Sequence, residues 1–144
     1  LKTDRSIEPL HRLIERLGLH DRLIVGSFSD RRLRDFRALS EGRVATSTGA
    51  AASRSWLFAS RIGRGVRGES GALQLPVRSR GIRVVDRRLV ATAHAHGLQV
   101  HAWTVNDPAE MTALLDIEVD GIITDRPDLL KEVLVARGEW TGLG

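Results

Sequence analysis

The chain contains no cysteine. This absence excludes a disulfide framework, thiolate chemistry and every metal site built on cysteine ligands. Long apolar runs are also missing, because no stretch approaches the roughly 20 residues that cross a bilayer as a helix. No signal peptide is visible in the sequence. These absences leave the compartment open, and a cytoplasmic location is favoured.

Aromatic residues make up only 4% of the 144 residues, whereas 42% of the residues are hydrophobic. An apolar fraction of this size is enough for a core, and the length is typical of one domain. A complete TIM barrel needs about 250 residues. The chain is therefore too short to form a whole barrel.

The net charge of +4 conceals an uneven distribution of charge. Residues 54–88 hold nine arginines and two acidic residues, whereas residues 89–144 hold three basic and nine acidic residues. The basic segment can be interpreted as a patch for phosphate, anionic lipid or nucleic acid. The alternative is a solvated loop and helix surface, which we favour because few aromatic residues interleave with the arginines. Nucleic acid is therefore not expected as a partner.

Strand and helix patterns alternate in the last third of the chain. Residues 98–105 form an apolar, β-rich run, and Asp107 after it has the side chain and position of a helix N-cap. Residues 119–124 are the next predicted strand, and Asp125 is predicted to cap the helix that begins near Pro127. Polar residues thus gather directly after each strand.

The rest of the chain follows the same rhythm, which predicts an α/β fold. Helices are predicted over 6–17, 29–39, 50–62 and 85–96, and strands over 22–27, 43–47 and 73–76. Successive βα units make the strands parallel, with right-handed connections. Parallel strands bring their C-terminal ends to one face, where a barrel enzyme keeps its active site.

Two short motifs resemble the C-terminal signature of one enzyme family. Trp103-Thr104-Val105-Asn106 is followed by Asp120-Gly121-Ile122-Ile123-Thr124-Asp125-x-Pro127, which is similar to the signature of the glycerophosphodiester phosphodiesterases. Val25-Gly26-Ser27-Phe28-Ser29 is similar to the strand of this family that ends in Ser-Phe. Leu1-Lys2 looks like the end of its Glu-x-Lys strand. The resemblance is strong over residues 1–39 and 84–138 and poor over 48–71.

The resemblance implies that residues 1–144 are the C-terminal part of a TIM barrel whose N-terminal half is missing. In the intact family, a divalent cation (Mg²⁺ or Ca²⁺) and two histidines hydrolyse a glycerophosphodiester to glycerol 3-phosphate and an alcohol. The His-Arg-Gly strand, the Glu-x-Asp pair and the second catalytic histidine belong to the missing half. This chain is therefore expected to be inactive alone and to hold no metal ligand.

The resemblance assigns three residues of this chain to the active site. Lys2 corresponds to a lysine that offers its charge to a phosphate oxygen, so it is the candidate catalytic residue. Phe28 and Trp103 correspond to the apolar wall that binds the glycerol or alkyl part of the substrate. Asp107 and Asp125 are interpreted as helix caps and not as metal ligands.

Two further patterns have structural interpretations. His101 shares strand parity with Trp103 and Val105, so all three side chains could point into the barrel. A hydrogen-bonded core histidine is favoured there over a catalytic one. Gly63-x-Gly65-x-x-Gly68 matches a dinucleotide-binding pattern, but it neither follows a strand nor opens a helix, so a loop is predicted.

A different class of function stays open beside the enzyme. The basic segment would allow a non-catalytic binding module for anionic lipid or nucleic acid. An incomplete barrel would also expose strand edges, which predicts self-association through those edges.

Overall fold

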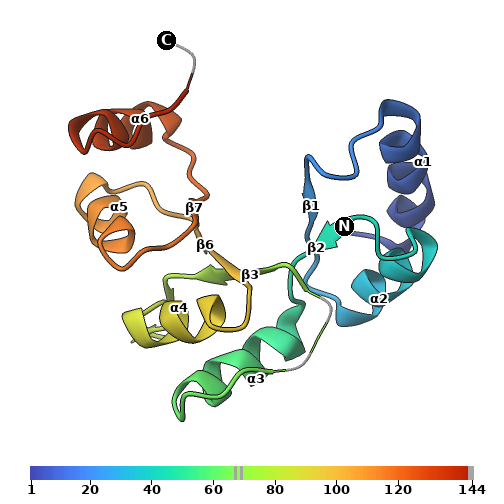
Figure 1. Ribbon diagram of the computed structural model, residues 1–144, viewed down its shortest axis with the longest axis horizontal. Helices are drawn as coiled ribbons and strands as arrows, with labels where there is room; N and C mark the ends of the chain where they lie inside the picture. The colour runs from blue at the N-terminus through green and yellow to red at the C-terminus, as the bar shows by residue number, and fades with distance from the viewer. Residues whose placement is uncertain (67, 69, 143–144) are drawn as a thin grey trace.

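Strands and helices alternate along the computed structural model, which describes residues 1–66, 68 and 70–142. The strands form an arc, and the helices lie on its outer side (Figure 1). Helix α1 (Ile7–Leu17) and helix α6 (Pro127–Ala136) stand at the two ends of the arc and flank its open side. The chain thus builds one side of a barrel.

Five parallel strands form the wall of this half-barrel. They are β1 (Ile24–Val25), β2 (Ala45–Thr46), β3 (Ala72–Pro76), β6 (Gln99–Trp103) and β7 (Gly121–Ile122). Strand β1 pairs with β2, and β6 lies between β3 and β7. A parallel bridge between Ser47 and Ala72 joins the two groups, so the spatial order is β1-β2-β3-β6-β7. The predicted parallel arrangement is confirmed.

The connecting helices begin largely where the sequence predicts. They are α2 (Asp30–Leu39), α3 (Ala50–Ser60), α4 (Arg87–His94) and α5 (Pro108–Leu115), and a short 3-10 turn, η1 (Asp4–Ser6), precedes α1. The hydroxyl of Ser29 accepts a hydrogen bond from the Arg32 amide at 3.3 Å, and Asp86 accepts one from the Leu89 amide at 2.9 Å. These side chains satisfy amide groups that the first turn of a helix leaves unpaired.

Three sequence-based expectations need correction. The strands β1, β2 and β7 are shorter than predicted. Residues 78–83, for which no strand was predicted, form an antiparallel hairpin of β4 (Arg78–Ser79) and β5 (Ile82–Arg83). Every residue of this hairpin is exposed, so it lacks the apolar alternation that identifies a strand. The helix predicted over 85–96 is also shorter, because α4 spans only Arg87–His94. Trp56 lies inside the helix predicted over 50–62 and is only 3% exposed.

The core lies between the strands and the helices. Leu73 and Leu75 of β3 and Val100 and Ala102 of β6 point outward and are buried beneath the helices. Burial of each of these leucine and valine side chains contributes about 1.5–3 kcal/mol. Because alternate residues of a strand point to opposite faces, the residues between them face the inside of the half-barrel. That inner face carries the candidate site.

No helix in residues 1–66, 68 and 70–142 is long and apolar enough to cross a membrane.

Candidate active site

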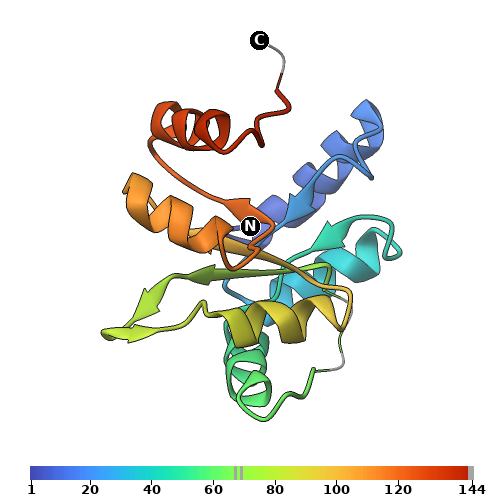
Figure 2. The ribbon, with the colours of Figure 1, turned by 60° about the vertical axis from the view of Figure 1, so that its left-hand side comes forward.

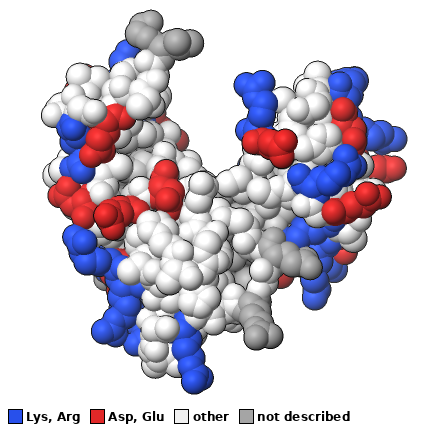
Figure 3. Space-filling model, viewed as in Figure 1, with Lys and Arg blue, Asp and Glu red and all other residues white. Residues whose placement is uncertain are grey.

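A cavity of about 680 Å³ opens at the C-terminal ends of the strands. We call it the strand-end cavity. Its lining comes from the chain start, the ends of β1, β2, β3 and β6, and the start of α3: Leu1, Lys2, Gly26, Ser27, Phe28, Arg32, Ser47, Thr48, Gly49, Ala50, Ser53, Gln74, Leu75, Pro76 and Trp103. The structure therefore brings together the three residues predicted for the site, Lys2, Phe28 and Trp103. In the view of Figure 3, charged side chains gather over the outer helices and are sparse at the centre of the molecule.

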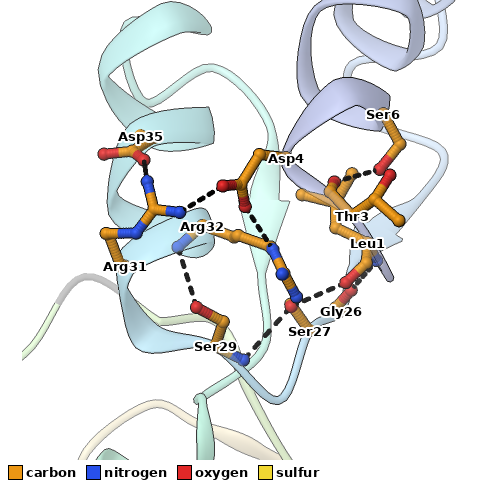
Figure 4. Close-up of polar contacts among 10 residues, drawn as sticks. All are labelled: Leu1, Thr3, Asp4, Ser6, Gly26, Ser27, Ser29, Arg31, Arg32 and Asp35. Carbon is orange, nitrogen blue, oxygen red and sulfur yellow. Dashed lines mark hydrogen bonds and ion pairs between the residues drawn. The ribbon is translucent and has the colours of Figure 1, made fainter.

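Lys2 reaches the cavity because the first residues run beside the end of β1. The amino group of Leu1 donates to the carbonyl oxygen of Gly26, and the hydroxyl of Ser27 donates to the carbonyl oxygen of Leu1 at 2.8 Å (Figure 4). Leu1 thus lies beside the residues that follow β1, at the outer end of the order of strands. This placement agrees with the interpretation of Leu1 and Lys2 as the end of a strand.

Asp4 attaches the same segment to α2. The Nε atom of Arg32 donates to Oδ1 of Asp4 at 2.6 Å, and Arg31 donates to the other carboxylate oxygen (Figure 4). Hydrogen bonds from Arg32 and then Arg31 lower the pKa of Asp4 below its usual value. The charge of Arg32 at the cavity is therefore already engaged. The ammonium group of Lys2, by contrast, makes no hydrogen bond or ion pair within the part of the chain that the structure describes.

Phe28 and Trp103 form an aromatic pair at the rim of the cavity. Their ring centroids are 5.9 Å apart and their planes meet at 75°, which is the edge-to-face arrangement. Phe28 is 75% exposed although it is a large apolar residue. The pair cannot be explained by core packing alone, and its open face can cover an apolar part of a ligand.

Polar, uncharged side chains also line the cavity. Thr48 and Ser53 share a hydrogen bond of 2.8 Å between their hydroxyl groups. A side chain at Gly26 would bring its Cβ within 2.8 Å of Oε1 of Gln74, so only glycine leaves room for that amide without a shift. Hydroxyl and amide groups here can bind hydroxyl groups of a ligand.

His101 does not line the strand-end cavity. Its Nδ1 lies 3.3 Å from Nε2 of Gln74, and its Nε2 lies 3.3 Å from Oε1 of Gln99. The predicted hydrogen bonds are present, but His101 is half-buried and is not part of the core. The expectation that Val105 shares its face is wrong, because β6 ends at Trp103 and Val105 is fully buried in the main core.

The lining of the cavity does not fit a divalent cation. No Asp, Glu or His is among the residues that line it. Across the described residues, no group of three or more His, Asp or Glu side chains could hold a metal ion. Hard cations such as Mg²⁺ and Ca²⁺ need several oxygen ligands, with carboxylates foremost. The chain's own residues cannot supply them at this cavity.

Asp107 and Asp125 differ in role, although the sequence predicts a helix cap for both. Asp107 is a cap, since it accepts a hydrogen bond from the Glu110 amide at 2.8 Å. Asp125 is not: α6 has Arg126 at its N-cap position, without a side-chain cap. Asp125 instead accepts a hydrogen bond from Nδ2 of Asn106 at 3.3 Å. Asn106 lies 19 residues before Asp125, so the sequence around Asp125 does not indicate this hydrogen bond.

Asn106 joins the loops that follow β6 and β7. Its Oδ1 accepts hydrogen bonds from the Thr124 hydroxyl at 3.0 Å and from the Asp125 amide at 2.9 Å. At the opposite end of the same strands, Asp120 accepts from the Val100 amide at 2.7 Å. The two signature motifs are therefore bonded to each other. The sequence analysis did not predict that Asn106 links the two loops. Its position directly after a strand is the only local indication of this role.

The comparisons with known proteins fit this geometry. Residues 4–129 match the model of the glycerophosphoryl diester phosphodiesterase family. The chain belongs to this family. The expected α/β fold, as the C-terminal part of a TIM barrel, is also confirmed.

Relatives with curated names support the assignment. The chain is 47% identical to a Mycobacterium tuberculosis protein named "Probable glycerophosphodiester phosphodiesterase 2", over 99% of this chain and 56% of that protein. It is 39% identical to a Bacillus subtilis protein named "Glycerophosphodiester phosphodiesterase", over 35% of this chain and 17% of that protein.

Two crystal structures show the same fold. One is of a Silicibacter pomeroyi protein assigned by name to the glycerophosphoryl diester phosphodiesterases, with a TM-score of 0.73, 22% identity, and coverage of 96% of this chain and 46% of that one. The other is of a glycerophosphodiester phosphodiesterase from Parabacteroides distasonis, with a TM-score of 0.67, 22% identity, and coverage of 96% and 56%. The chain spans about half the length of these matches.

Proposed function

We propose that this chain supplies the C-terminal strands and one wall of the active site of a glycerophosphodiester phosphodiesterase. The reaction is hydrolysis of a glycerophosphodiester to glycerol 3-phosphate and an alcohol. The observation that carries the proposal is the convergence of Lys2, Phe28 and Trp103 on one cavity at the C-terminal ends of parallel strands. Active sites of this barrel architecture are built at that end.

Each of the three residues has a role that follows from its chemistry. The ammonium group of Lys2 offers a positive charge to a non-bridging phosphate oxygen, and such a charge stabilises negative charge that develops on the phosphoryl group. The edge-to-face pair of Phe28 and Trp103 covers the glycerol or alkyl part of the substrate. Thr48 and Ser53 also line the cavity, and their hydroxyl groups can bind a glycerol hydroxyl.

The remaining chemistry is proposed to come from residues outside this chain. A bound Mg²⁺ or Ca²⁺ would act as a Lewis acid on the phosphoryl group. Its carboxylate ligands and the histidines that move protons have no counterpart in the lining of the strand-end cavity. Residues 1–144 alone are therefore expected not to turn over substrate, with or without added metal.

The test is a chimera with the Mycobacterium tuberculosis relative. Residues 1–144 replace the matching segment of that protein, to which they are 47% identical. Purified chimera and isolated chain are assayed with glycerophosphocholine in the presence of Mg²⁺ or Ca²⁺. We expect hydrolysis by the chimera and none by the isolated chain. Metal-dependent turnover that persists when the isolated chain is repurified would contradict the proposed division of roles.

A lysine substitution tests the site itself. Lys2→Met in the chimera should lower kcat/KM by about 100-fold, the usual effect of removing one group that stabilises transition-state charge. The matched control is Lys131→Met, because Lys131 lies on α6 over the ring of Trp140, at 5.3 Å from its centroid. An unchanged kcat/KM for Lys2→Met would remove Lys2 from the catalytic machinery.

The proposal also covers the association state of the half-barrel and its location in the cell. Strands β1 and β7 are the outermost of the five parallel strands, and unpaired strand edges favour association. We propose self-association of the isolated chain through these edges, and a cytoplasmic location. Light scattering over a dilution series tests the first point, and cell fractionation tests the second.

A further inference from the structure

The hairpin of β4 and β5 projects from the C-terminal end of β3, which is the end that carries the strand-end cavity. Figure 2 shows it in yellow-green, extending past the neighbouring elements. Strand β3 is the middle strand of five, with β2 on one side and β6 on the other. The hairpin is thus remote from the open edges, where further strands would complete the barrel.

Arginines occupy positions of the hairpin where they are energetically unfavourable. Arg78 is directly opposite Arg83 in the antiparallel pair, and like charges at opposed positions destabilise a hairpin. The turn consists of Arg80 and Gly81, both with positive φ, at 50° and 78°. Two-residue turns of this kind favour Asn, Asp or Gly at their first position. Folding alone therefore gives no reason for three arginines in these six residues.

These arginines are also not neutralised by the rest of the described chain. Some other arginines of the basic segment are engaged: Arg61 pairs with Asp86 at 2.8 Å, and Arg87 donates to the Asp116 carbonyl oxygen at 2.9 Å. Among the described residues, no ion pair forms with the hairpin arginines, and Arg83 alone bonds through its side chain, to the carbonyl oxygen of Val85 at 3.0 Å. The hairpin thus presents uncompensated positive charge to the solvent.

An apolar residue accompanies this charge. Ile82 lies next to the turn and is 67% exposed. A long cationic side chain beside an exposed apolar one suits the interface of a bilayer, where guanidinium groups contact headgroups and the apolar group enters the acyl boundary. The phosphate backbone of a nucleic acid would use the charge but would leave Ile82 without a role. No aromatic residue in the hairpin could stack on bases.

We propose that the hairpin, residues 78–83, docks this protein on an anionic lipid bilayer. Arg78, Arg80 and Arg83 bind lipid phosphates, and Ile82 inserts between the headgroups. Docking at this end turns the strand-end cavity toward the lipid surface. The binding does not depend on the proposed hydrolysis.

The test uses the whole chain and lipid vesicles. Vesicles of phosphatidylcholine mixed with phosphatidylglycerol should bind the chain in a flotation assay, whereas vesicles of phosphatidylcholine alone should not. The double variant Arg78→Gln/Arg80→Gln should weaken binding by at least about tenfold, given the usual contribution of a basic residue near an anionic surface. The matched control Arg54→Gln/Arg64→Gln removes two exposed charges from α3 and the loop after it, and should change binding by less than about twofold.

A second variant separates insertion from charge. Ile82→Ser keeps every arginine and should still weaken vesicle binding by about threefold or more, since the apolar contact is lost. Both hairpin variants should keep the far-ultraviolet circular dichroism of the parent, because the hairpin is exposed. Equal losses in the hairpin and control double variants would overturn the proposal, as would an Ile82→Ser variant that binds normally. Hairpin-dependent binding of duplex DNA without vesicle binding would overturn it in favour of nucleic acid.

Discussion

The two ends of the half-barrel use positive charge in different ways. At the N-terminal ends of the strands, a cavity of about 1590 Å³ is lined by Arg37 and Arg43 among other basic residues. Arg43 pairs with Glu15 at 2.7 Å, and Nε of Arg37 donates to the hydroxyl of Thr46 at 2.7 Å. At the strand-end cavity, Lys2 has no such partner among the described residues. Charge counts alone would favour the end opposite to the proposed site, although Arg37 and Arg43 there are bonded to other residues of the fold.

Two tryptophans give the largest expected contrast. Trp56 of α3 is buried in the main core, so Trp56→Ala should lower the free energy of unfolding by about 3–5 kcal/mol. Trp103 lies on the cavity rim, so Trp103→Ala in the chimera should lower kcat/KM by about tenfold or more, as expected when a positioned apolar contact is lost. Urea unfolding and steady-state kinetics, compared at matched folded fraction, measure the two effects. Equal losses of kcat/KM would remove Trp103 from the site.

Arg37 tests whether charge at the opposite end is structural. Arg37→Met leaves the buried hydroxyl of Thr46 without its donor, which should lower the free energy of unfolding by about 1–3 kcal/mol. The kcat/KM of the chimera, corrected for folded fraction, should stay unchanged. A loss of kcat/KM as large as that of Lys2→Met would show that both ends serve the reaction.

Asn106 refines the comparison at the strand-end cavity, because it stabilises the loops after β6 and β7 but does not line the cavity. Asn106→Ala removes the acceptor of the Thr124 hydroxyl and the Asp125 amide, and should cost about 1–2 kcal/mol of unfolding free energy. Asn106→Asp keeps the acceptor oxygen but replaces the amide donor with a carboxylate beside that of Asp125, so it should recover little of that loss. Full recovery of stability by Asn106→Asp would argue against the contact between residue 106 and Asp125.

Glu15 gives the smallest expected effect, through pH. Hydrogen bonds from His20 and then Arg43 lower the pKa of Glu15 in the folded chain. A lowered pKa contributes stability above the unfolded value of about 4.3, and this contribution is lost as the pH falls through the folded value. In urea unfolding, the free energy of unfolding should therefore decrease less between neutral and acidic pH for Glu15→Gln than for the parent. The side chain is exposed, so the difference should be small.

Local patterns explain what could be predicted. The cap by Asp107 was predictable because donor and acceptor are three residues apart, and the alternation of Leu73 and Leu75 with Gln74 reflects the period of a strand. Lys2, Phe28 and Trp103 could be placed together because parallel strands share one direction. The family motifs supplied their proposed roles.

Contacts between distant segments explain what could not be predicted. Asp125 follows a strand as Asp107 does but stands two residues before its proline, so Arg126 takes the N-cap position. Asp125 bonds Asn106 instead, because the loops after β6 and β7 meet only once the strands have paired. The hairpin lacks an apolar face, so its two strands are specified by their turn and by pairing with each other.

The sequence by itself determined the alternation of strands and helices, the family and the residues that close each strand, since periodicity, caps and motifs act over a few residues. Only the tertiary structure decided which end of the half-barrel leaves its cation unpaired, that Trp56 is core, and that three arginines share one exposed hairpin. Those outcomes depend on which side chains meet across many residues, and local propensity carries no information about such meetings.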